Sequence, residues 1–124
     1  MDAFRDDRRR RFEVRLVQML KSEYSDWDRG HTERSLADLV HEAIAAARAL
    51  EVTWETELAD FVGLYFELGP EFHRHVLVRA VFDDSTVPVN KKIETTFHRF
   101  TRGDWESIRR ESKTPDHAAV PASN

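Results

Sequence analysis

The sequence has no cysteine, few glycines and no catalytic signature, and each absence excludes a class of protein. Without cysteine among its 124 residues, the chain has no disulfide scaffold, no thiol nucleophile and no thiolate metal site. Its four glycines are not clustered, which excludes phosphate-binding glycine loops and dinucleotide fingerprints. A nucleophile elbow is missing as well. We therefore expect a protein that is not an enzyme and that carries no cofactor.

The chain also lacks an excess of positive charge and a long apolar run. Its formal net charge is -4, from 19 basic and 23 acidic residues, whereas a generic nucleic-acid binder is usually basic. A membrane-spanning helix needs about 20 apolar residues, and the arginine-rich N-terminus does not look like a secretory signal. We expect a cytoplasmic protein that does not enter a membrane, and the charge counts against nucleic acid as its partner.

One stretch, from Leu58 to Leu68, is apolar nearly all the way round a helix. Its large apolar side chains follow helical spacing: Leu58, Phe61, Val62, Tyr65 and Phe66. A helix that is apolar on all sides is buried among its neighbours. We therefore predict a buried central helix over about residues 54–68, ended by Gly69 and Pro70, since glycine supplies a left-handed cap and proline cannot continue the helix.

Amphipathic patterns predict further helices around this one. A first helix is expected over about 3–24, a second over about 32–50 with Thr32 as its N-cap, another over about 88–100, and a short last helix after it. The stretch Val76–Phe82 fits either a short helix or a strand, and the helical context favours a helix.

These patterns predict an all-α protein, a compact bundle of about five to six helices around the central helix. We expect a single domain over residues 1–111. The polar, proline-containing residues 112–124 carry no apolar stripe, and we predict that they form a disordered tail.

Several residues are candidates for binding a partner. Trp27 lies in a connector between the first two helices, where it either anchors that connector on the core or contacts a partner. Trp54 is expected to be a core residue at the start of the central helix. Arg8 and Arg9 belong to an arginine-rich helix start that suits phosphates or an acidic partner, although pairing with neighbouring aspartates explains the same pattern.

Two further groups of residues are an acidic pair and a set of candidate metal ligands. Asp83 and Asp84 form an acidic edge that could mimic a nucleic-acid backbone towards a basic nuclease. Glu71, His73 and His75 alternate along the chain, so an extended segment would place all three side chains on one face, where they could bind a metal. On a helix they would not face one another, and they are then ordinary surface residues.

Four short motifs resemble a family of small, helical, uncharacterised proteobacterial proteins found near type VI secretion effector genes. They are Phe12-Glu13-x-Arg15, the segment Ile44–Ala49, Thr56–Phe61 and Phe66–Phe72, within about residues 4–82. The chain departs from the family pattern in the link Leu50–Thr53 and at Glu71 and His73.

This resemblance implies a non-enzymatic protein-binding module of a type VI secretion or toxin locus. Its partner would be a toxin or a secretion-spike component, and its role that of an immunity protein, an adaptor or an effector chaperone. Two alternatives remain open: a metal-binding protein or metal-dependent enzyme that uses Glu71, His73 and His75, and a nucleic-acid-binding regulator that uses the N-terminal arginines. The sequence also leaves a homodimer open.

Overall fold

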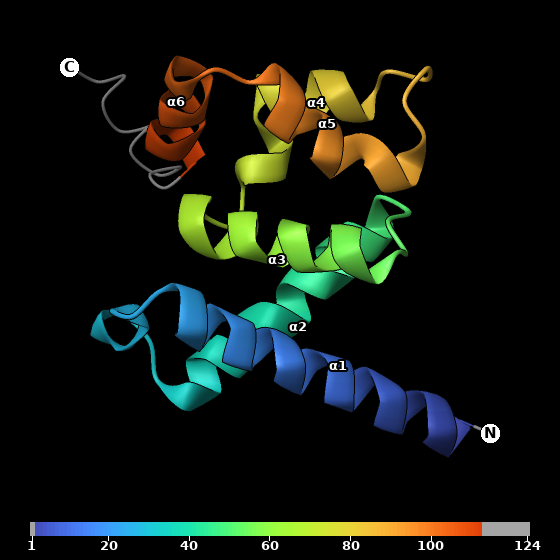
Figure 1. Cartoon of the computed structure of the whole chain (residues 1–124), viewed down its shortest axis with the longest axis vertical. Coiled ribbons are helices and arrows are strands. Elements are labelled where there is room, and N and C mark those ends of the chain that lie inside the picture. Colours follow the sequence, from blue (N-terminus) through green and yellow to red (C-terminus); the bar gives the residue numbers. More distant parts are fainter. Residues whose placement is uncertain (1, 113–124) are drawn as a thin grey trace, which may run out of the picture.

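The computed structural model describes residues 2–112, with side chains from Asp7 onward, and this part of the chain is all-α (Figure 1). It contains six α-helices and no strand, so the predicted fold class is confirmed. The helices are α1 (Asp2–Glu23), α2 (Glu33–Ala49), α3 (Glu55–Leu68), α4 (Val76–Phe82), α5 (Lys92–Arg99) and α6 (Arg102–Ser112).

The predicted tail falls largely on residues 113–124, which lie outside the described part of the chain. Ser112, expected to be the first residue of the tail, is instead the last residue of α6, and it is buried. None of the helices in the described part of the chain has both the length and the apolar composition that crossing a bilayer requires.

Helix α3 is the centre of the bundle, as its sequence predicts. It runs across the middle of Figure 1, with α1 and α2 on one side and α4, α5 and α6 on the other, and it contacts α1, α2, α5 and α6. Its fully buried side chains lie on one broad face that spans about 160° of the helix: Glu57, Leu58, Phe61, Val62, Leu64, Tyr65 and Leu68. Ala59 and Phe66, which are partly buried against the core, widen this face, and neighbouring helices contact α3 on both flanks.

The ends of α2 and α3 follow from local chemistry. Thr32 caps α2 as predicted, since its hydroxyl accepts the N–H of Ser35 at 3.0 Å while the Ser35 hydroxyl accepts the N–H of Thr32 at 2.8 Å. Gly69 ends α3 with φ 111° and ψ 161°, a backbone conformation that only glycine adopts readily. Helix α3 therefore stops where the sequence predicts.

The far end of α2 is a Schellman motif with an unusual residue in it. The N–H of Val52 donates to the carbonyl of Ala47 at 3.0 Å, and the N–H of Glu51 donates to that of Arg48 at 2.8 Å. Glu51 has φ 71°, at the position where such motifs favour glycine. The backbone of Glu51 is therefore strained at this turn.

Helix α4 confirms the helical interpretation of the ambiguous segment. His75 precedes it, and the Nδ1 atom of His75 accepts the N–H of Leu77 at 3.1 Å, which caps the first turn. Val78 and Val81 face the core. A strand could not have placed these two residues, which are three apart, on one face.

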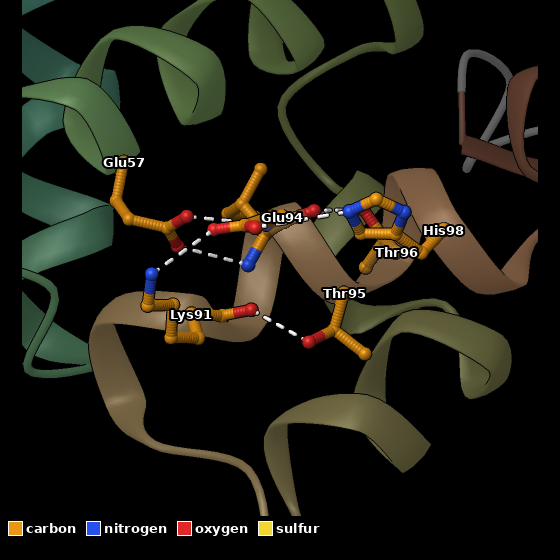
Figure 2. A network of polar contacts seen from close by, with 7 residues as sticks. Glu57, Lys91, Glu94, Thr95, Thr96 and His98 are labelled. Carbon is orange, nitrogen blue, oxygen red and sulfur yellow. Dashed lines mark hydrogen bonds and ion pairs between the residues drawn. The ribbon is translucent and has the colours of Figure 1, made fainter.

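Helix α5 has no side chain of its own to cap its first turn, and Glu57 of α3 takes that role (Figure 2). The Glu57 carboxylate accepts the N–H of Ile93 at 2.9 Å and the N–H of Glu94 at 3.1 Å. Only 3% of Glu57 is exposed. A buried charge from one helix thus satisfies the free N–H groups of another, which the sequence does not indicate.

Candidate functional site

The predicted partner residue Trp27 is not an exposed aromatic. It lies in the 3-10 turn Trp27–Arg29, where it is half-buried and packs against the core. The ammonium of Lys21 lies 5.1 Å from the centre of its ring. The structure therefore places Trp27 as the anchor of the connector, which was the first of its two interpretations.

The predicted acidic edge is partly neutralised. Asp84 accepts hydrogen bonds from the hydroxyl of Thr86 at 2.6 Å and from its N–H at 2.9 Å, and it lies 3.4 Å from Arg99 Nη1. The Thr86 hydroxyl, followed by the Thr86 N–H, lowers the pKa of Asp84. Asp83 lies 3.9 Å from Arg79 Nε. The lowered pKa keeps Asp84 negatively charged, and each aspartate lies beside one arginine.

Glu71, His73 and His75 each contact different neighbours instead of forming one cluster. Glu71 pairs with Arg74 at 3.1 Å. His75 uses Nδ1 to cap α4, and its Nε2 lies 2.5 Å from Glu111 Oε1. The His73 ring packs 5.6 Å from the centre of the Phe72 ring, and burial lowers its pKa. Among the described residues, no group of three His, Asp or Glu side chains is arranged to hold a metal ion.

The exposed tryptophan of this protein is Trp54, which the sequence indicates as a core residue. It is 53% exposed and stands directly before the first turn of α3. A tryptophan exposed to this extent is costly to leave in water and is typical of protein-binding surfaces. The expectation that Trp54 is a core residue is therefore wrong, and the buried apolar residue at this end of α3 is Leu58, one turn further along.

The backbone beneath Trp54 is held in place by Asn90. Asn90 Oδ1 accepts the N–H of Thr53 at 2.8 Å and the N–H of Trp54 at 3.0 Å, while its Nδ2 donates to the Thr53 hydroxyl at 3.1 Å. These three bonds join a turn before α5 to the start of α3. The backbone that carries the exposed indole is therefore already ordered. Binding a partner would then cause a smaller loss of conformational entropy.

Arginines from two helices line a hollow next to the backbone segment that carries Trp54. This hollow, of about 330 Å³, is lined by Arg8 and Arg9 of α1, by Arg48 of α2, and by the segment that flanks Trp54 (Thr53, Glu55). The floor of this hollow is apolar, formed by Phe12 and Leu58. Arg8 and Arg9 were predicted binding residues, and the fold brings Arg48 to them across some 40 positions of sequence.

A lysine completes this surface from a third direction. The ammonium of Lys91 lies 5.5 Å from the centre of the Trp54 ring. It also lies 3.5 Å from Glu94 Oε1 (Figure 2). We call the surface made by Arg8, Arg9, Arg48, Trp54 and Lys91 the Trp54 face. It carries four cationic groups, and Glu55, the carboxylate that lines its hollow, lies 3.5 Å from Arg15.

The Trp54 face can bind negatively charged groups next to an aromatic ring. Guanidinium groups form paired hydrogen bonds with carboxylates and phosphates, and an indole provides area for an apolar neighbour. One part of this surface could have been found in the sequence. Ala47 belongs to the apolar stripe of α2, so the next residue, Arg48, must point away from the core.

Comparison with known proteins identifies no relative: no family model, no curated protein and no solved structure matches this chain. The resemblance to small helical proteins of type VI secretion loci therefore rests on the quoted motifs alone.

Proposed function

We propose that this chain is a non-enzymatic protein-binding module of a bacterial type VI secretion or toxin locus, and that it holds an acidic segment of its partner against the Trp54 face. The observation that carries the proposal is the exposed Trp54 on a backbone clamped by Asn90. Tryptophan and arginine are the residues most enriched among those that dominate binding energies at protein interfaces. This face presents both.

Charge favours an acidic polypeptide over nucleic acid. The face concentrates four cationic groups on a chain whose formal net charge is -4. An acidic segment of limited length can be held by this local surplus alone. A long nucleic acid extends past the face and meets the negative charge that dominates elsewhere, which weakens its binding.

The test uses tagged wild-type protein and three variants to capture partners from extracts of the source bacterium, identified by mass spectrometry. Trp54→Ala and Arg48→Glu change the Trp54 face. Phe97→Ala is the matched control, because Phe97 is 50% exposed and lines a different hollow with Leu64 and Leu68, near the other end of α3. Circular dichroism and urea unfolding establish that each variant is folded.

One toxin or secretion-spike protein should be held by the wild type and by Phe97→Ala, and lost with Trp54→Ala and Arg48→Glu. With the purified partner, Trp54→Ala should raise the dissociation constant about 30-fold or more, as expected for a residue at the centre of an interface. Equal recovery by all four proteins would contradict the proposal. Recovery that depends on nucleic acid in the extract would support the regulator alternative instead.

A further inference from the structure

A second surface with aromatic residues is formed by the end of α3 together with α5 and α6, and these two helices lie on the other side of α3 from α1 and α2 (Figure 1). It contains a hollow of about 490 Å³. Phe97 of α5 and Trp105 of α6 line this hollow, with ring centres 5.7 Å apart, and the buried Leu64 and Leu68 of α3 line it as well. We call this surface the α6 face.

The aromatic side chains of the α6 face are only partly covered. Phe97 is 50% exposed, and Trp105 is half-buried. The ring of Phe100 lies 5.0 Å from that of Trp105, so the three rings form one cluster. Covering apolar area of this kind is favourable in water, and aromatic residues are enriched in protein interfaces. The cluster is therefore suited to a protein partner.

The charged side chains of the α6 face balance one another in sign: Glu67, Arg102, Glu106 and Arg109. Arg109 Nη2 lies 3.0 Å from Glu67 Oε2, which joins α6 to α3. Within the described part of the chain, Arg102 and Glu106 form no ion pair. They are four residues apart on α6, with the basic residue first, which is the less favourable order for a pair within one helix.

From this arrangement we infer that the α6 face binds a second copy of this chain, in a symmetric dimer in which Arg102 of each copy pairs with Glu106 of the other. A two-fold interface contains every contact twice with the roles exchanged, so it needs both charges on one surface. A two-fold axis that crosses the α6 face halfway between Arg102 and Glu106 makes the two α6 helices antiparallel and brings these opposite charges together. Trp105 lies between them along the helix, so the same axis brings the two aromatic clusters into contact.

Charge also distinguishes the α6 face from the Trp54 face. The Trp54 face carries a surplus of cationic groups, so two copies repel each other there. The charges that line the α6 face sum to zero, and no such repulsion opposes its self-association. Trp54 stands before the first turn of α3, whereas Leu64 and Leu68 of the α6 face belong to its last turns. A dimer through α6 therefore leaves both Trp54 faces open to other proteins.

Sedimentation velocity of the full chain, from about 5 to 500 µM, measures the equilibrium between monomer and dimer. The wild type should dimerise with a dissociation constant of about 10–100 µM, as is typical of a small interface. Arg102→Glu and Glu106→Arg should each raise it about tenfold or more, because each puts two contacts between like charges into the interface. Arg34→Glu makes the same change at an exposed arginine of α2 and should leave it as in the wild type.

The decisive sample is an equimolar mixture of the Arg102→Glu and Glu106→Arg variants. Each variant alone carries two like charges at positions 102 and 106, whereas a heterodimer of the two has opposite charges at both contacts. The mixture should therefore dimerise about as well as the wild type. Exchange within a single helix could not restore the dimer in this way, since the two changes are on different chains.

Phe97→Ala should raise the dissociation constant of the dimer about tenfold, because it removes exposed aromatic area from the interface. It should still capture the partner of the Trp54 face, so the two binding functions are separable. Circular dichroism first establishes that each variant is folded. A wild type that is monomeric up to 500 µM, or a mixture as monomeric as its components, would overturn the inference. So would another captured protein that Arg102→Glu loses and Trp54→Ala keeps, because the α6 face would then belong to that protein.

Discussion

The carboxylate of Glu57, in the first turn of α3, accepts a hydrogen bond from the backbone of Ile93 at 2.9 Å, in the first turn of α5 (Figure 2). A second bond comes from Glu94 at 3.1 Å. Ile93 follows Glu57 by 36 positions along the chain. The start of α5 is therefore capped by a side chain of α3.

We expect Glu57→Ala to lower the free energy of unfolding by about 2–4 kcal/mol, because two buried N–H groups lose their acceptor. Glu57→Gln keeps one acceptor oxygen and should cost about half as much. Urea unfolding near neutral pH measures both. Glu55→Gln is the control: Glu55 is exposed and lies 3.5 Å from Arg15, so its change should stay below about 0.5 kcal/mol. Equal effects at both positions would contradict the capping role.

The contribution of Glu57 should also depend on pH in a definite direction. Burial raises the pKa of Glu57 above its ordinary value of 4.5, more than the bonds from Ile93 and Glu94 lower it, and the nearby carboxylate of Asp60 adds to the rise. The folded protein therefore holds this proton more tightly than the unfolded chain does. The resulting stability is fully present below pH 4.5 and is lost as the pH rises through the folded-state pKa.

Glu57→Gln does not titrate at this position, so the difference in unfolding free energy between wild type and variant isolates the effect. This difference should shrink as the pH is raised from about 4 to about 7. A difference that grows over the same range would show that the folded-state pKa lies below 4.5 instead.

Two glycines of the central region should respond to alanine with opposite signs. Gly69 has φ 111° and ψ 161°, so Gly69→Ala should destabilise the protein by about 1–3 kcal/mol. Gly63 lies inside α3, and a Cβ added there meets no atom within 4 Å. Gly63→Ala should therefore stabilise the protein by about 0.5–1 kcal/mol. Thermal unfolding of both variants checks the pair, and two shifts of the same sign would be evidence against it.

The hydrogen bonds from Asn90 to the backbone of Thr53 and Trp54 predict a local effect in amide hydrogen exchange. Asn90→Ala removes the acceptor of the N–H groups of Thr53 and Trp54, so both amides should exchange about tenfold faster or more. Asn90→Asp keeps an acceptor oxygen and should leave them protected. If Asn90→Ala leaves these two amides as slow as in the wild type, the side chain of Asn90 is not what holds this segment.

Much of the fold could be predicted because its signals are local. The apolar run of α3, the Thr32 cap and the stop at Gly69 each lie within a few residues of sequence, and the central helix, the cap and the stop are confirmed. Burial on all sides of α3 is not, because its fully buried residues lie on one broad face. Residues with long-range partners could not be predicted in this way. Glu57 looks like an ordinary acidic residue of a first helical turn, and only the approach of α5 makes it a buried cap.

The difference between local and long-range signals also explains which site residues could be predicted from the sequence and which could not. Arg8 and Arg9 are visible as a run of like residues, whereas Arg48 joins them only through the packing of α1 against α2. The exposure of Trp54 depends on what covers it. Apolar side chains near a helix start are usually buried, and no feature of the segment before Glu55 shows that this one is not.

Three consecutive residues, Asn90 to Lys92, connect the Trp54 face to the end of α4. Asn90 holds the backbone of Trp54 and Lys91 lies over its ring, while the ammonium of Lys92 donates to the carbonyl oxygens of Val81 and Asp84. A displacement of this short turn would therefore disturb the support of the exposed indole and the end of α4 together.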